Sequence, residues 1–146
     1  MPVEIKLLGC DDAGVLTRVA PGVFDHAVSE DLCAEFLSDP RHHLAVALGD
    51  GVVVGFASAV HYVHPDKPAE LWINEIGVAQ ECRKQGLGRK LLEVILGRGR
   101  ELGCGEAWVL AHRGNVPAMN LYKSDGGIEA SPPPAMFIFD LNLSDE

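Results

Sequence analysis

Apolar residues follow two periods along this 146-residue chain, one typical of strands and one typical of helices. Alternating or continuous apolar runs rich in β-branched residues predict six strands, over residues 3–8, 43–48, 52–60, 71–78, 106–111 and 136–141. Apolar spacings of three and four predict four helices, which start after Asp12, at Ser29, at Gly88 and at Asn115 or Val116. We therefore expect an α/β (α+β) fold, in a single domain that spans residues 1–146.

Connections between these elements predict how the strands pair. Gly49-Asp50-Gly51 joins two apolar runs and is typical of a tight β-hairpin. The helix over residues 88–102 carries Leu91 and Ile95 on one side and is expected to pack on the sheet. Because a helical crossover joins parallel strands, this helix makes residues 71–78 and 106–111 a parallel pair. Gly97 and Gly99 are expected to weaken it by about 1 kcal/mol each relative to alanine.

A cluster of positive charge lies between the strand at residues 71–78 and that helix. Four of the chain's 12 Lys and Arg residues fall within residues 83–90, namely Arg83, Lys84, Arg89 and Lys90. Gly86 and Gly88 allow the backbone to approach a ligand closely, and the start of the helix adds a partial positive charge. A glycine-rich turn of this kind is typical of a phosphate-binding site.

The pattern of the turn narrows the choice of phosphate ligand. The dinucleotide fingerprint fails because Leu91 stands where its third glycine is required, and no P-loop pattern occurs in the chain. What remains is R-x-x-G-x-G over residues 83–88, which resembles the acetyl-CoA-binding motif of the GNAT superfamily of N-acetyltransferases. A second hallmark of that superfamily, N-x-x-A-x-x-x-Y-x-x-x-G, follows over residues 115–126.

The resemblance implies a fold and a set of cofactor contacts. The expected fold is a mixed, mostly antiparallel sheet flanked by about four helices, in which two parallel strands splay apart around the pantetheine arm of acetyl-CoA. By this resemblance the cofactor is held by Ile76, Gly77, Val78, Arg83, Lys84, Gln85, Gly86, Leu87, Gly88, Arg89, Lys90, Asn115, Ala118 and Tyr122.

Acetyl transfer to an amine also requires particular chemical groups. The amine must lose a proton, the thioester carbonyl oxygen needs hydrogen-bond donors, and the departing thiolate needs a proton. Glu75 stands in an apolar strand, where an unused carboxylate costs free energy, and we interpret it as the base, directly or through water, or as an anchor for a substrate ammonium. The amide N–H of Val78 and the phenol of Tyr122 are expected to supply the other two functions.

The charge balance indicates the acceptor. A net charge of −9 argues against nucleic acid or an anionic membrane as partner and favours a cationic small molecule, although solubility alone also explains such a charge. The chain is most similar to the small aminoglycoside 3-N-acetyltransferases around Glu75, around Tyr122 and at Phe139-Asp140, which implies antibiotic resistance. That group has Asp where this chain has Glu75, and its substrate-wall helices match poorly. Glu70 and Asp140 join Glu75 as expected substrate-binding residues.

Two other functions remain open at this stage. The first is acetylation of a peptide N-terminus, a lysine or a polyamine, and the second is a non-catalytic acyl-CoA-binding module. Cys10, Cys33, Cys82 and Cys104 form no C-x-x-C pair, and His61 and His64 lack a neighbouring carboxylate or thiol, so we expect no metal site. With no apolar run of membrane-spanning length and no leader pattern, the expectation is a cytoplasmic monomer or homodimer.

Overall fold

The computed structural model describes residues 2–142. It divides into two compact units, a larger one that ends at His112 and a smaller one that begins at Arg113. No helix among the described residues is long and apolar enough to cross a membrane.

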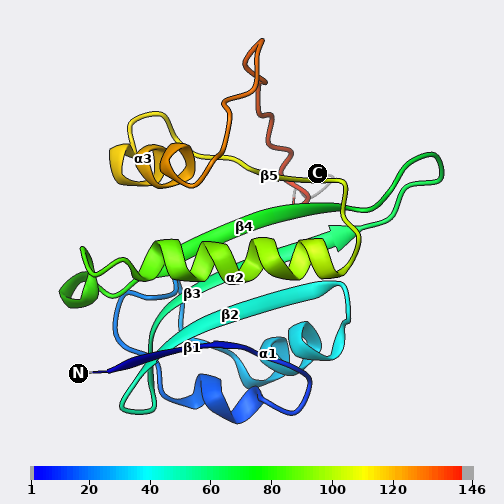
Figure 1. Ribbon diagram of the computed structural model, residues 1–146. Coiled ribbons are helices and arrows are strands. Elements are labelled where there is room, and N and C mark those ends of the chain that lie inside the picture. The colour runs from blue at the N-terminus through cyan, green and yellow to red at the C-terminus, as the bar shows by residue number, and fades with distance from the viewer. Residues whose placement is uncertain (1, 143–146) are drawn as a thin grey trace. The chain divides into compact units, whose positions relative to one another are not determined.

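A five-stranded sheet in the order β1-β2-β3-β4-β5 forms the larger unit (Figure 1). Its strands are β1 (Val3–Leu7), β2 (His42–Gly49), β3 (Val52–Tyr62), β4 (Glu70–Val78) and β5 (Glu106–Val109). The first three pairs are antiparallel and the last pair is parallel. The predicted mixed, mostly antiparallel sheet with one parallel pair is therefore confirmed.

The predicted hairpin joins β2 to β3. Asp50 and Gly51 both have positive φ angles, of 50° and 77°. Positive φ at both central residues is the geometry of a type I′ turn, whose twist matches that of the flanking strands.

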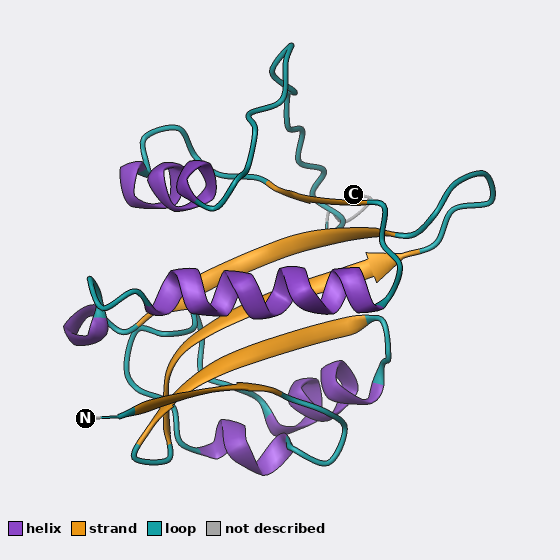
Figure 2. Cartoon of the chain, in the orientation of Figure 1, coloured by secondary structure: helices purple, strands orange, loops and turns teal. Residues whose placement is uncertain are grey.

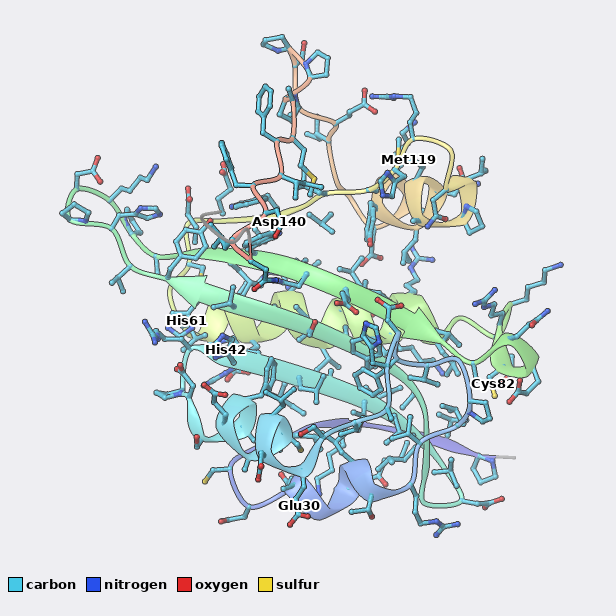
Figure 3. All side chains as sticks on the ribbon, turned by 180° about the vertical axis from the view of Figure 1, so that it is seen from behind. Glu30, His42, His61, Cys82, Met119 and Asp140 are labelled. Carbon is cyan, nitrogen blue, oxygen red and sulfur yellow. The ribbon has the colours of Figure 1, made fainter. Side chains whose placement is uncertain are left out.

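Helices lie on both faces of this sheet. One face is crossed by α2 (Leu87–Glu101), and the view from behind shows α1 (Glu30–Ser38) in front of the other face (Figures 2 and 3). The hydroxyl of Ser29 accepts a hydrogen bond from the Leu32 amide at 3.3 Å, which confirms the predicted N-cap.

The helix expected after Asp12 is only a short 3-10 helix, η1 (Ala13–Thr17). The Asp12 carboxylate accepts hydrogen bonds from the Gly9 amide and the Lys6 ammonium, and it makes no cap to the helix. An uncapped segment of five residues is too short to form a stable α-helix. The described part of the larger unit thus has two α-helices and two 3-10 helices, the second of which is η2 (Gln80–Cys82).

The core lies between α2 and the sheet. Val46, Val53, Leu71, Leu91 and Ile95 are its largest fully buried side chains. A Cβ built on Gly55 would meet the Leu91 side chain, and one on Gly99 would meet Leu71. Residues 55 and 71 therefore face α2, and their strand neighbours Phe56 and Trp72 face the opposite side.

The smaller unit contains α3 (Val116–Ser124), which begins where predicted. Asn115 is its N-cap and accepts a hydrogen bond from the Ala118 amide at 3.2 Å. Gly126 has a φ of 96°, and the Gly127 amide donates to the Tyr122 carbonyl at 2.8 Å, which ends the helix. Burial raises the pKa of the Tyr122 phenol.

The strand predicted over residues 136–141 is not formed, and this expectation was wrong. The segment makes no strand pairing within the described chain, and its apolar side chains are exposed. An apolar run can adopt a strand only when its backbone groups pair with a neighbouring strand, and sequence patterning does not supply that partner.

Substituting the two glycines of α2 separates helix propensity from packing. A Cβ on Gly97 meets nothing within 4 Å, whereas one on Gly99 lies 3.0 Å from the buried Leu71 side chain. Gly97→Ala should therefore stabilise the fold by about 1 kcal/mol. Gly99→Ala should be neutral or destabilising by up to about 2 kcal/mol, because overpacking offsets the gain. Urea unfolding midpoints at matched m-values measure both effects, and equal stabilisation by the two variants would contradict the packing argument.

A histidine pair lies beside Leu71, which is the cross-strand partner of His61. His43 is 5% exposed, and its Nε2 is 2.7 Å from His61 Nδ1. At this distance one ring donates and the other accepts, so the pair requires a neutral imidazole at the accepting nitrogen. Burial, then the charges of His61 and Arg98, lower the pKa of His43 to about 4.

This pair makes stability depend on pH. Because the folded pKa of His43 lies below the ordinary value of 6.5, the unfolded chain binds the proton first as pH falls. The unfolding free energy should be highest above pH 6.5 and should decrease by roughly 2 kcal/mol as the pH falls from 7 to 5. Chemical unfolding of the native chain and of a His43→Leu/His61→Leu double variant measures this slope. An unchanged slope in the double variant would refute the assignment.

Candidate active site

The parallel strands β4 and β5 separate partway along their length. They pair over four positions, from Glu70↔Glu106 to Ile73↔Val109, and β4 then continues to Val78 without β5 beside it. Within the described chain no other strand pairs with this side of β4. Residues 74–78 therefore have an open edge, as the predicted splayed pair requires.

Backbone groups at this edge can be oriented from the hydrogen bond that follows it. The Ala79 amide donates to the Val54 carbonyl on the β3 side at 2.8 Å. Because strand backbone groups alternate in direction, the amides of Ile76 and Val78 point the other way, toward the open edge. The Val78 carbonyl confirms this direction, since it accepts a hydrogen bond from Arg83 Nε at 3.1 Å. Two N–H donors therefore face the gap beside β4.

A β-bulge at the point of separation sets the direction of the Glu75 side chain. Glu75 pairs with Ser58 while Ile73 pairs with Ala59, so Asn74 is an extra residue in β4. Ile73 faces α2, and the extra residue places Glu75 beside Ser58 on the opposite face. Without the bulge, strict alternation would place Glu75 on the buried α2 face. Glu75 is exposed there, not enclosed by the apolar strand as its sequence context indicated.

A cavity of about 310 Å³ opens over this carboxylate. Its floor is Phe56, Ser58 and Glu75 from the sheet, and its walls come from α1 and the segment before it. That segment carries Asp25 and His26, and it also borders a larger, adjoining cavity of about 810 Å³. Carboxylates from two elements thus line a cavity that suits a cationic ligand.

Gly77 shapes the floor of this cavity. A Cβ at this position would lie 2.6 Å from the Val23 carbonyl oxygen and 2.8 Å from the Phe56 ring. No side chain fits there without moving the segment before α1. Phe24 in that segment stacks on Phe56, with ring centroids 4.1 Å apart. By the same alternation the amide of Gly77 points to β3, so its contribution to the site is the absence of a side chain.

The loop between β4 and α2 has the features of an anion site. Lys84 and Gly86 have φ angles of 66° and 76°, which curl the loop before the helix. Gly86 is the N-cap of α2 and supplies no side-chain cap, so the first amides of the helix remain available to a ligand. Arg83, Lys84, Gln85, Arg89 and Lys90 are exposed around this end, while the Leu87 side chain is buried in the core. The loop and the open β4 edge together fit a diphosphate attached to an extended amide-bearing arm.

The remaining predicted site residues are Glu70 in the larger unit and four residues of the smaller unit. Glu70 is at the start of β4, where His64 Nε2 lies 3.1 Å and Lys67 Nζ 3.9 Å from its carboxylate. Asn115, Ala118, Tyr122 and Asp140 belong to the smaller unit, in which Asn115 caps α3 and Asp140 accepts from the Asn142 amide at 2.9 Å. The roles assigned to all four remain predictions.

Sequence reasoning did not single out Asp25, His26 or Ser58. Asp25 and His26 stand between two predicted helices in a segment with no periodic pattern. This polar interruption between the helices was the signal that could have identified them. Ser58 gave no signal, because its position opposite Glu75 depends on the bulge.

Comparison with known proteins places this geometry among acetyltransferases. The chain is 33% identical over 89 residues to streptothricin acetyltransferase of Streptomyces lavendulae, which covers 61% of this chain and 45% of that protein. It is 23% identical over 133 residues to spermine/spermidine N(1)-acetyltransferase of Bacillus subtilis strain 168, covering 86% and 88%.

Solved structures share the fold. An aminoglycoside acetyltransferase from an uncultured soil metagenomic sample, in complex with sisomicin, superimposes with a TM-score of 0.81 at 19% identity and covers 95% of this chain and 96% of that one. Aminoglycoside acetyltransferase AAC(6')-Iy, with a bisubstrate analogue of CoA, has a TM-score of 0.73 at 21% identity, covering 96% and 99%. Residues 15–126 match the model of the acetyltransferase (GNAT) family. The chain therefore belongs to the GNAT family of acetyltransferases, whose members use acetyl-CoA.

Proposed function

We propose that this protein transfers the acetyl group of acetyl-CoA to a primary amine of a cationic small molecule, and that all of residues 1–146 act as one catalytic domain. The observation that carries the proposal is the position of Glu75. Its carboxylate lies in a cavity with Asp25, on the strand whose outward amides and following cationic loop fit the acetyl donor.

Acetyl-CoA supplies an activated acetyl group as a thioester. Arg83, Lys84, Arg89 and Lys90, with the first amides of α2, neutralise its diphosphate. The outward amides of Ile76 and Val78 hold its extended arm, and the Val78 amide donates to the carbonyl oxygen on which negative charge develops. Gln85, Gly86 and Gly88 contribute backbone that approaches the phosphates closely. Asn115 and Ala118, at the start of α3, bind the cofactor as well.

Glu75 prepares the amine in this mechanism. An amine in water carries a proton, and an ammonium has no lone pair with which to attack a carbonyl. Glu75 binds the ammonium and accepts its proton, directly or through one water. The nitrogen then bonds to the acetyl carbon and loses its second proton to solvent, and the bond from that carbon to sulfur breaks.

Tyr122 donates the proton that the leaving sulfur requires. Its phenol is protonated at neutral pH, which is the form a donor needs, and burial raises its pKa further above neutral. The tyrosinate that remains recovers a proton from solvent.

An aminoglycoside is the acceptor that we favour. Asp25 and Glu75 suit a polycation, and the adjoining cavity of about 810 Å³ gives room for further rings. Several of the similar structures are aminoglycoside acetyltransferases, and one similar protein is a streptothricin acetyltransferase. Transfer to a 3-amino group and a role in antibiotic resistance follow from the sequence resemblance. Asp140 and Glu70 would extend the acidic surface around the substrate.

A polyamine is the second candidate acceptor. The Bacillus subtilis relative that matches 88% of its own length is a spermine/spermidine acetyltransferase, and a linear polycation satisfies the same two carboxylates. A non-catalytic acyl-CoA-binding module is the remaining alternative. It does not account for a base and a protonated phenol in the same chain.

Replacing the proposed base tests catalysis. Glu75→Gln preserves shape and removes the proton acceptor, so kcat/KM should fall by about 10²- to 10⁴-fold. Thiol release from acetyl-CoA is measured with a gentamicin-like aminoglycoside, a polyamine and a lysine peptide. Glu81→Gln, at an exposed acid of η2, is the matched control and should retain activity. Full activity of Glu75→Gln would refute the assigned base, and silence of the native chain on every amine would favour the non-catalytic module.

Replacing the loop cations tests cofactor binding. Arg83→Gln/Lys84→Gln removes two charges at the proposed diphosphate site, and CoA affinity should fall by about 10- to 100-fold because charge-assisted contacts are lost. Isothermal titration calorimetry with CoA measures the change. Arg18→Gln, at an exposed cation after η1, should bind CoA as the native chain does. Equal affinity of the two variants would place the diphosphate elsewhere.

A further inference from the structure

Two tryptophans lie on the same face of the sheet as Glu75. Trp72 pairs with Val60 across β3 and β4, and the neighbouring positions Ile73 and Leu71 face α2. Trp72 therefore points to the side that carries Ser58 and Glu75. Trp108 on β5 stands opposite Trp72 in the parallel register and shares this face.

The two indoles form one aromatic surface. Their ring centroids are 5.0 Å apart and their planes differ by 12°, so they are stacked. Both side chains are only half-buried, although tryptophan is the largest apolar side chain. Neither ring takes part in the proposed acetyl transfer.

Carboxylates lie on both sides of this aromatic surface. Glu75 lies beyond Trp72, on the part of β4 that has the open edge. Glu70 and Glu106 pair with each other two residues before the two tryptophans, on the same face of the sheet. His64 and Lys67 already approach Glu70, while Glu106 is exposed. Along the strands the Glu70–Glu106 pair therefore comes first, the two tryptophans come next, and Glu75 comes last.

We propose that Trp72 and Trp108 form a second acceptor subsite that binds an additional ammonium group of the substrate while the reacting amine lies at Glu75. This inference rests on the proposed function and narrows it to acceptors with at least two positive charges. The face of an indole attracts a cation through its quadrupole, and the flanking carboxylates add to that attraction.

Geometry sets the spacing between the two cations. Trp72 and Glu75 are three residues apart on a strand, which corresponds to roughly 7–10 Å. An acceptor with amines at this separation would place one at each subsite. A monoamine of the same length would leave the indoles without a cation.

The test compares α,ω-diaminoalkanes with 1-aminoalkanes of the same chain length as acceptors for acetyl-CoA. For the native chain, kcat/KM should favour the diamine, with an optimum at the length whose amines are about 7–10 Å apart. In Trp72→Leu, which stays apolar but loses the π face, this preference should fall about three- to thirty-fold. The loss should lie in KM and not in kcat, and Trp72→Phe should restore most of it.

Each result bears on one of the two proposals. Equal use of mono- and diamines by the native chain, at every length, would overturn the second subsite and leave the proposed function standing. So would a Trp72→Leu variant that keeps the full diamine preference. If Trp72→Leu does not fold, Trp108→Leu is measured in the same way. Absence of thiol release with any amine would overturn both proposals.

Discussion

The separation of β4 from β5 after Ile73 is the constraint on which the rest of the site depends. Buried backbone N–H groups are normally paired inside a sheet, so a strand without its neighbour presents donors that need another partner. At Ile76 and Val78 these donors point into the gap, and Arg83 already binds the carbonyl of Val78. A ligand with an extended chain of amide and thioester groups can take the place that β5 leaves. This gap has the form that the acetyl-CoA used by the family would need.

Charge is distributed so that two ligands of opposite sign can meet at this gap. The chain is acidic overall, yet the loop before α2 gathers four of its cations at the start of a helix. The opposite face of the same strand carries Glu75, and the segment across the cavity carries Asp25. One residue, the bulged Asn74, decides that Glu75 belongs to this second face. A one-residue shift of register would turn the carboxylate into the core and remove it from the cavity that Asp25 also lines.

Most of the fold could be predicted from local pattern. The hairpin at Asp50-Gly51, the cap at Ser29 and the crossover through α2 were all readable because each depends on residues close in the chain. Two expectations failed because the hydrogen-bond pairing that each element needs is not made. The segment after Asp12 lacks the capping bond that would start an α-helix, and residues 136–141 have the composition of a strand without a pairing edge among the described residues. The sequence could not show that Gly99, unlike Gly97, lies against the buried Leu71 side chain.

The sequence by itself determined the family, and it indicated residues 83–90 as a candidate phosphate site and Glu75 as a candidate base, because motif spacing and charge clusters can be recognised without knowledge of contacts. Only the tertiary structure decided which amides of β4 are open, which face Glu75 occupies and which residues surround it. Asp25, Ser58 and the stacked Trp72 and Trp108 come from separate elements and meet only through register and packing. The sequence pattern encodes the alternation of side chains within each strand. The position of a bulge and the point at which two strands stop pairing are set by the contacts of the whole sheet.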